Sequence, residues 1–247
     1  SVELAKILRQ MVSLHEKKVS DDLEEGMDVS VLIAGLGNRE VTPDALGPKV
    51  VDHLFITRHI INEFGHYAFS DEKTSRISGI VPGVMAQTGM ECVEILRGII
   101  KETEPDFIIT VDALAARNVK RLNRTIQLTD TGITPGSGIG NHRNALNQES
   151  LGIPVISLGV PTVVNAATIV ADAMNDLIEA ETGSNADLKN LDEHERQELA
   201  RELLSPQLNG LFVTPKNIDD SIKQLSFLIS EGLNIALLGN KDENANI

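Results

Sequence analysis

Three short runs of apolar residues along the chain show no alternation with polar residues. They are Val31–Leu36, Phe107–Val111 and Pro154–Val160. Runs of this length that end in turn residues are typical of strands buried on both faces of a sheet. Ile77–Val84 is a further extended piece ending near Pro82-Gly83, and the alternation over Arg124–Asp130 is compatible with another strand.

Between these runs, apolar residues recur every three or four positions, the spacing of a helix with one buried face. The segments with this pattern are Val2–His15, the stretch from Pro48 to Ile61, Glu91–Glu102, Val163–Glu181 and Ile218–Leu238. Strands that alternate with helices favour a mostly parallel or mixed twisted sheet with both faces covered. We therefore expect an α/β protein with a three-layer α/β/α fold and a helical C-terminal extension.

The 247 residues are expected to form a single domain, with a core at about 31–181 and a helical extension at about 184–247. The chain contains no Pro-rich or Ser-rich linker and no repeat at the periods of solenoid proteins. After Gly183 the composition becomes polar and acidic, until the apolar pattern returns at Ile218.

The charge and composition exclude several classes of partner. Lys and Arg number 22 against 36 Asp and Glu, which gives a net charge of −14, so the surface repels nucleic-acid phosphates and anionic lipids. Aromatic residues make up 3%, too few for a base-stacking platform, and no stretch of about 20 apolar residues is uninterrupted. Neither direct nucleic-acid binding nor a membrane span is expected. The single cysteine, Cys92, suits a reducing, cytoplasmic setting.

Most motifs that carry chemistry are incomplete in this chain. Gly35-Leu36-Gly37 follows a strand as in dinucleotide-binding loops, but Glu40 stands where the third glycine belongs. No two histidines have the spacing of a zinc site, so no metal or cofactor is expected. Cys92 lies in a predicted helix and is interpreted as a small buried residue. Asp130-Thr131-Gly132, a single copy of the pepsin-type triplet, is interpreted as a turn.

Two acidic residues remain as candidates for catalysis. Asp112 directly follows the run Phe107–Val111, and Asp44 lies in the turn after the first strand. Each has a structural alternative: Asp112 as the cap of a helix over Ala113–Asn118, and Asp44 as a carboxylate near a helix N-terminus. If the two strands are parallel, however, both acids lie at the same edge of the sheet. Two close carboxyl groups share a proton, so one can activate water while the other polarises a carbonyl group.

Several segments around these acids have a distinctive sequence. They are Gly35-Leu36-Gly37-Asn38, Val41-Thr42-Pro43-Asp44-Ala45-Leu46-Gly47-Pro48, Pro82-Gly83-Val84-Met85, Val111-Asp112-Ala113-Leu114-Ala115, Asp130-Thr131-Gly132-Ile133, Pro135-Gly136-Ser137-Gly138 and Gly159-Val160-Pro161-Thr162-Val163-Val164. Together they resemble the bacterial spore germination proteases over roughly Val31–Ala180.

The resemblance implies an atypical aspartic endopeptidase that degrades small acid-soluble spore proteins when a spore germinates, in the cytoplasm of the spore core. It implies Asp44 and Asp112 as the catalytic pair, synthesis as a zymogen with an N-terminal propeptide, and a homotetramer. It also implies a fold like that of the hydrogenase-maturation endopeptidases, in which acids at these strand ends and a histidine bind the substrate's nickel.

Two alternatives stay open from the sequence. The first is a nickel-recognising hydrogenase maturation protease, for which His142 in the glycine-rich loop at Thr131–Asn147 is a remote candidate for the missing histidine. The second is a non-catalytic domain whose glycine-rich loops only bind spore proteins.

Overall fold

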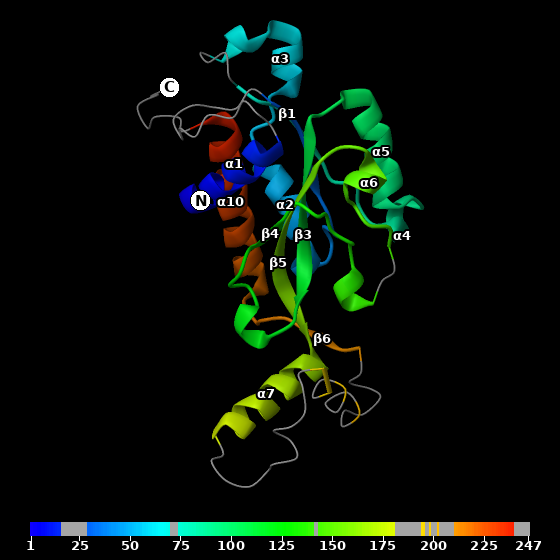
Figure 1. Ribbon diagram of the computed structural model, residues 1–247, viewed down its shortest axis with the longest axis vertical. Coiled ribbons are helices and arrows are strands. Elements are labelled where there is room, and N and C mark those ends of the chain that lie inside the picture. The colour runs from blue at the N-terminus through cyan, green and yellow to red at the C-terminus, as the bar shows by residue number, and fades with distance from the viewer. Residues whose placement is uncertain are drawn as a thin grey trace.

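The computed structural model describes residues 1–15, 29–69, 74–140, 143–180, 194–195, 198, 202 and 210–239 (Figure 1). Within them, six strands form one mixed sheet in the order β2-β1-β3-β5-β4, with β6 paired to the end of β5. The strands are β1 (Ser30–Gly35), β2 (Arg76–Ile80), β3 (Phe107–Ala116), β4 (Gln127–Thr129), β5 (Val155–Asn165) and β6 (Phe212–Val213). The three apolar runs of the sequence are thus β1, β3 and β5, the central strands.

The neighbouring pairs β1–β2, β1–β3 and β3–β5 are parallel, whereas β4 and β6 run antiparallel to β5. The carboxyl ends of the parallel strands therefore meet at one edge of the sheet. In open α/β sheets this edge is where ligands bind.

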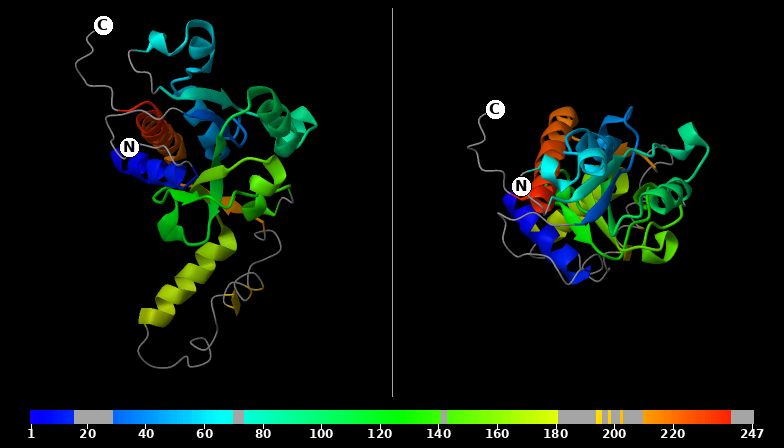
Figure 2. Two further views of the ribbon diagram at one scale, coloured as in Figure 1. Left: turned by 45° about the horizontal axis from the view of Figure 1, so that its top comes forward. Right: turned by 90° about the horizontal axis from the view of Figure 1, so that it is seen from above.

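Helices cover both faces of the sheet, which confirms the α/β/α prediction. On one face, Val31 and Ile33 of β1 pack with α1 (Val2–His15), α2 (Leu46–Asp52) and α10 (Ile218–Leu238). On the other face, Leu32 and Ala34 pack with α5 (Cys92–Thr103) and α6 (Gln148–Leu151). The view from above shows α1 and α10 on one side of the strands and α5 on the other (Figure 2).

The remaining helical segments connect these layers or project from them. They are η1 (Thr42–Asp44), α3 (Arg58–Phe64), η2 (His66–Ala68), α4 (Met85–Thr88), η3 (Val119–Arg121), η4 (Ser137–Ile139) and α7 (Ala166–Ala180). The helix α7 extends away from the sheet, below it in Figure 1. None of the described helices combines the length and the apolar character that a membrane span requires.

Two strands are longer than the sequence pattern predicts. Asp112 does not end β3, which continues to Ala116, so the alternative of a helix over Ala113–Asn118 capped by Asp112 is wrong. The strand continues because its last residues pair with the end of β5, out to Ala116 opposite Val164. The same pairing keeps the expected start of the next helix extended, and α7 begins only at Ala166.

The helix expected between Pro48 and Ile61 is divided into two. α2 ends at Asp52 and α3 begins at Arg58, with Thr57 between them. The Thr57 hydroxyl donates to the Ser75 carbonyl at 2.5 Å and accepts from the Ile77 backbone N–H at 2.8 Å. These bonds hold the connection against the start of β2, and a continuous helix could not make them.

Two glycines allow α2 to approach the sheet closely. A Cβ atom at Gly47 would overlap the carbonyl oxygens of Leu36 and Val111, and one at Gly35 would overlap the Gly47 carbonyl. The start of α2 therefore lies directly over the ends of β1 and β3. The turn that carries Asp44 precedes this helix, so the same contact fixes its distance from β3.

We predict that Gly47→Ala lowers the free energy of unfolding by about 1–3 kcal/mol, because the added methyl group would displace backbone that cannot yield. Chemical denaturation measures this change. Gly98→Ala is the matched control: Gly98 lies inside α5 with open space where a Cβ would be. It should stabilise the protein by about 0.5–1 kcal/mol through helix propensity. Equal stability of Gly47→Ala and wild type would contradict the close approach.

Candidate active site

Asp44 and Asp112 lie together at the carboxyl edge of the central strands. Asp44 ends the short helix η1, which follows β1, and Asp112 lies within β3. The Leu36 backbone N–H donates to the Val111 carbonyl at 2.8 Å, which ties the end of β1 to β3 just before Asp112. Both carboxyl groups line the same two pockets, and the charge on one affects the pKa of the other. The structure thus brings together the two residues that the sequence singled out.

The Asp44 carboxylate is oriented by backbone. Its Oδ2 accepts a hydrogen bond from the Asn38 N–H at 2.7 Å. Gly37 next to it has a φ of +109°, and a Cβ there would overlap the Asp44 carbonyl oxygen. Burial raises the pKa of Asp44 above its usual value, and the hydrogen bond from Asn38 opposes that shift.

Asp112 is the more deeply buried acid, with 4% of its surface exposed. Its Oδ1 accepts from the Ala113 backbone N–H at 2.9 Å. Burial, and then the negative charge of Asp44, raise the pKa of Asp112 to about 7, against a smaller opposing effect of the Ala113 hydrogen bond. Below neutral pH, Asp112 therefore carries a proton.

The two carboxyl groups differ in environment, so the pair loses its protons in two separate steps. Between these steps one group is ionised and the other is protonated. An ionised carboxylate can accept a proton from water, while a protonated one can donate a hydrogen bond to a carbonyl oxygen. This combination can hydrolyse an amide.

The pair lies where two pockets meet. The larger pocket has a volume of about 670 Å³, and the smaller one, of about 100 Å³, contains Cys92, Met85 and Arg143. The larger pocket is lined mainly by β3, the end of β5, η1 and the glycine-rich loop. These residues include Pro43, Ala113, Leu114, Ala115, Ile133, Gly136, Ser137, Gly138, Thr162, Phe212 and Thr214. A polypeptide bound across the two acids would thus have a pocket on either side of them.

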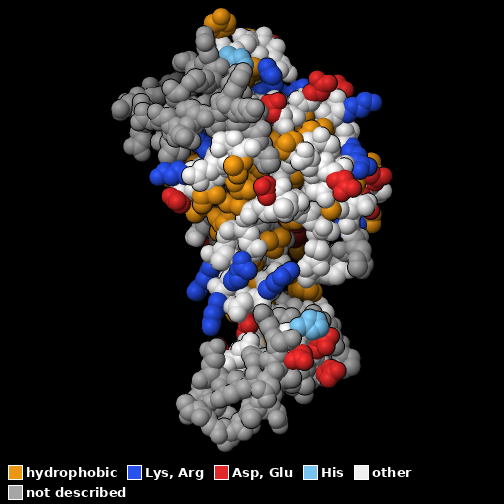
Figure 3. Space-filling model, viewed as in Figure 1, with side chains coloured by type: hydrophobic (Ala, Val, Ile, Leu, Met, Phe, Trp, Pro, Cys, Tyr) orange, Lys and Arg blue, Asp and Glu red, His pale blue; other side chains and the backbone are white. Residues whose placement is uncertain are grey.

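Basic residues gather at one wall of the larger pocket, on the segment between β3 and β4. The segment contains Arg117, Lys120, Arg121 and Arg124, and two of them, Arg117 and Arg121, line the pocket. Figure 3 shows Lys and Arg side chains gathered in the lower part of this face. This wall is positive although the whole chain carries a net charge of −14.

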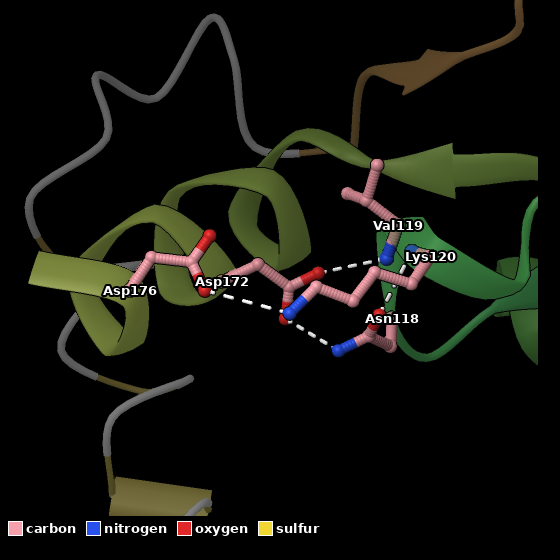
Figure 4. A network of polar contacts seen from close by, with 5 residues as sticks. All are labelled: Asn118, Val119, Lys120, Asp172 and Asp176. Carbon is pink, nitrogen blue, oxygen red and sulfur yellow. Dashed lines mark hydrogen bonds and ion pairs between the residues drawn. The ribbon is translucent and has the colours of Figure 1, made fainter. Parts of the chain in front are cut away.

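The helix α7 anchors this basic segment (Figure 4). The Asp172 carboxylate accepts from the Val119 backbone N–H at 2.7 Å and from the Asn118 side-chain amide at 3.2 Å. Lys120 and Asp176 form an exposed ion pair at 3.6 Å. The pocket wall is therefore held by a helix that starts at the end of β5.

The other residues considered in the sequence play different parts. Asp130 is exposed on a bend and does not line either pocket, as expected for a turn residue. Cys92 is half-buried at the start of α5, where its thiol contacts the Gly83 carbonyl at 3.7 Å. His142 lies outside the described residues. Among the described residues, no cluster of three or more His, Cys, Asp or Glu could hold a metal ion.

Comparison with known proteins decides the family. The model of the germination protease family matches residues 3–190 and 185–247. The chain belongs to the germination protease family. The germination protease of Caldanaerobacter subterraneus subsp. tengcongensis is 48% identical over 217 residues, and that of Clostridium perfringens strain SM101 is 44% identical over 245 residues.

These alignments cover 85% and 96% of the present chain but 66% and 71% of the two relatives, so the chain spans about two thirds of the length of these germination proteases. Among solved structures, a [NiFe] hydrogenase maturation protease HycI from Thermococcus kodakarensis is 18% identical. The structural alignment covers 83% of the present chain and 92% of the HycI chain, with a TM-score of 0.37.

Sequence reasoning found the two acids of this candidate site but missed most of the residues that form its walls. Arg117 and Arg121 carried a signal, since four basic residues fall within eight positions of an acidic chain. Cys92 and Thr162 carried none, because their place at the site depends on contacts between distant segments. From the glycine-rich loop, Gly136, Ser137 and Gly138 line the larger pocket.

We predict that the stability of Asp112→Asn, compared with that of the wild-type protein, is higher at alkaline pH than at acidic pH. Because the pKa of Asp112 is raised in the folded state, that state holds a proton that the unfolded chain releases, so stability falls as pH rises from about 4 to 7. The asparagine variant removes this cost. Its unfolding free energy relative to wild type should be more favourable at pH 8.5 than at pH 4.5 by a few kcal/mol, on the order of 1.4 per pKa unit.

Denaturation curves at the two pH values test this expectation. The exposed control Asp130→Asn should keep the wild-type pH dependence. A constant stability difference between Asp112→Asn and wild type at both pH values would show that burial does not penalise the Asp112 charge.

Proposed function

We propose that this protein is an endopeptidase that uses Asp44 and Asp112 to activate water and degrades small acid-soluble spore proteins during germination. The observation that carries the proposal is the buried Asp112, whose pKa is raised to about 7 next to a second carboxylate, at the junction of two pockets. Membership of the germination protease family supports the substrate and the setting in the spore core.

The two carboxyl groups divide the chemistry between them. The ionised Asp44 takes a proton from a water molecule as the water oxygen attacks the carbonyl carbon of the scissile amide. The protonated Asp112 donates a hydrogen bond, and then its proton, to the carbonyl oxygen. When the tetrahedral intermediate collapses, the C–N bond breaks, the leaving nitrogen takes the proton from Asp44, and Asp112 recovers its own.

The larger pocket favours an extended polypeptide as substrate. The pocket is lined by the ends of β3 and β5 and by the apolar side chains of Leu114, Ile133 and Phe212. A protein that is unfolded when free can place several residues along such a cleft without first losing structure. The proposal also includes synthesis as a zymogen with an N-terminal propeptide.

We predict that Asp44→Asn and Asp112→Asn each reduce cleavage of a purified small acid-soluble spore protein by 100-fold or more, because each variant removes a group that transfers a proton. Both should remain folded. Asp130→Asn is the matched control, and it should cleave at nearly the wild-type rate because Asp130 lies on an exposed bend outside both pockets.

Gel analysis of discrete products measures this loss, with circular dichroism as the test of folding. Either Asp variant cleaving at the wild-type rate would exclude the pair. Binding of the spore protein without cleavage by wild type would favour a non-catalytic domain. Loss of wild-type activity in a chelator, restored by one divalent metal ion, would favour the nickel-recognising class.

The apolar surface of α10 supports the proposed homotetramer. Phe227 and Leu228 leave 56% and 38% of their surfaces exposed, and the Phe227 ring lies edge-on to His53 with centroids 6.0 Å apart. Exposed apolar side chains that adjoin on one helix are typical of contacts between subunits.

We predict a mass four times that of one chain by light scattering at micromolar concentration, and a smaller mass for Phe227→Asp, because a buried unpaired charge opposes assembly. Phe64→Asp places the same change at an exposed phenylalanine of α3, 64% exposed, and should leave the mass unaltered. A monomeric wild-type protein would contradict assembly of this chain.

A further inference from the structure

A threonine of β5 forms a hydrogen bond to the turn that carries Asp44. The Thr162 hydroxyl donates to the carbonyl oxygen of Pro43, the residue before Asp44, at 2.6 Å. Thr162 is 1% exposed, and it is 119 residues from Pro43 in the chain. The bond thus joins two segments that only the fold brings together.

An irregularity in the sheet aims Thr162 at this turn. Along the β3–β5 pair, Leu114 lies opposite Pro161 and the next residue, Ala115, lies opposite Val163. Thr162 is therefore the extra residue of a β-bulge. A bulge breaks the strict alternation of side chains and redirects one of them, and bulges are common beside active sites.

The position of Thr162 is itself fixed by the C-terminal segment. The Thr214 hydroxyl, just after β6, donates to the Thr162 carbonyl at 2.8 Å. A second bond to the same turn comes from the start of α10, where Asp219 accepts from the Thr42 hydroxyl at 3.1 Å. Thr162 and the Asp44 turn are thus each held by a bond to the C-terminal segment. These bonds are separate from the Asn38 N–H, which orients the Asp44 carboxylate directly.

We propose that Thr162 is a positioning residue for catalysis: the bulge in β5 directs its hydroxyl to the Pro43 carbonyl and so holds the Asp44 carboxylate at the distance from Asp112 at which the two acids share a proton. This inference rests on the proposed function, because it assigns Thr162 a part in the same reaction. Thr162 acts through the backbone of the turn and not on the substrate.

A structural bond and a positioning bond lead to different results. If the bond only stabilises the fold, its loss lowers the unfolding free energy and leaves turnover by folded protein unchanged. If it positions Asp44, its loss lowers kcat, because small displacements of reacting groups are costly. The negative charge of Asp44 would also raise the pKa of Asp112 less. The upper, alkaline limb of the pH–rate profile, where Asp112 loses its proton, would therefore move to lower pH.

The Thr162 hydroxyl donates to the Pro43 carbonyl and not to the other charged groups that line the two pockets. Arg143 and Glu91 line the smaller pocket with Cys92, and Arg117 and Arg121 line the larger one. They lie just before α5, on the glycine-rich loop and on the β3–β4 connection, whereas this hydroxyl bonds to the Asp44 turn. A change in the pH profile of a Thr162 variant therefore reports on the Asp44 turn.

The test compares Thr162→Val and Thr162→Ser with wild type. Valine keeps the shape of threonine without its hydroxyl, whereas serine keeps the hydroxyl. Thr110→Val is the matched control, because Thr110 is a fully buried threonine of the same strand pair whose hydroxyl donates to Ser157 at 2.8 Å, away from the pockets. Steady-state cleavage of the spore protein, pH–rate profiles and thermal melting are measured for all four proteins.

We expect Thr162→Val to lower kcat by 10-fold to about 100-fold with KM changed less than about threefold, and to lower the pH of the upper limb. Thr162→Ser should restore most of kcat, and Thr110→Val should lose stability but keep kcat. Unchanged kcat and profile in folded Thr162→Val would overturn the inference, as would equal losses of kcat in Thr110→Val. Should Asp44→Asn retain activity, the proposed function itself fails, which is a separate outcome.

Discussion

A carboxyl group in the middle of a buried strand is the constraint on which the site depends. In β3, Asp112 follows residues that are fully buried, and burial is the largest cause of its raised pKa, followed by the negative charge of Asp44. Such a group stays neutral until the pH approaches its raised pKa. Ionising Asp112 in the folded protein lowers the free energy of unfolding. The raised pKa keeps Asp112 protonated up to near neutral pH, which is the property that the proposed mechanism requires of the proton donor.

The rest of the fold places the second acid against the first. The glycines Gly35 and Gly47 let α2 lie directly over the ends of β1 and β3, and the turn of Asp44 is fixed by the start of that helix. Asn38 then orients the carboxylate, and Thr162 holds the backbone before it. Main chain and buried hydroxyl groups do this work instead of charged side chains. A cation at either acid would lower its pKa and remove the protonated partner that the chemistry needs.

The sequence was informative where local pattern decides structure. Apolar runs without alternation identified the three central strands, and the parallel pairing of β1 with β3 brings Asp44 and Asp112 to one edge. It failed where distant pairing decides: the apolar segment after Asp112 is compatible with helix or strand, and only its pairing with β5 makes it extended. The division between α2 and α3 at Thr57 depends on β2 in the same way. The bulge at Thr162 cannot be read from composition, because it is a mismatch between two strands.

The bulge links the shape of the cleft to the geometry of the acids. Beyond it, β5 runs on to pair with β6 and to start α7, which anchors the basic wall through Asp172. A regular β5 would alternate its side chains without interruption, and its register with the end of β3 would shift by one residue. The residue that reaches the Asp44 turn and the helix that holds the pocket wall would then both be displaced. One extra residue in a central strand thus affects the positions of both the Asp44 turn and the basic wall of the larger pocket.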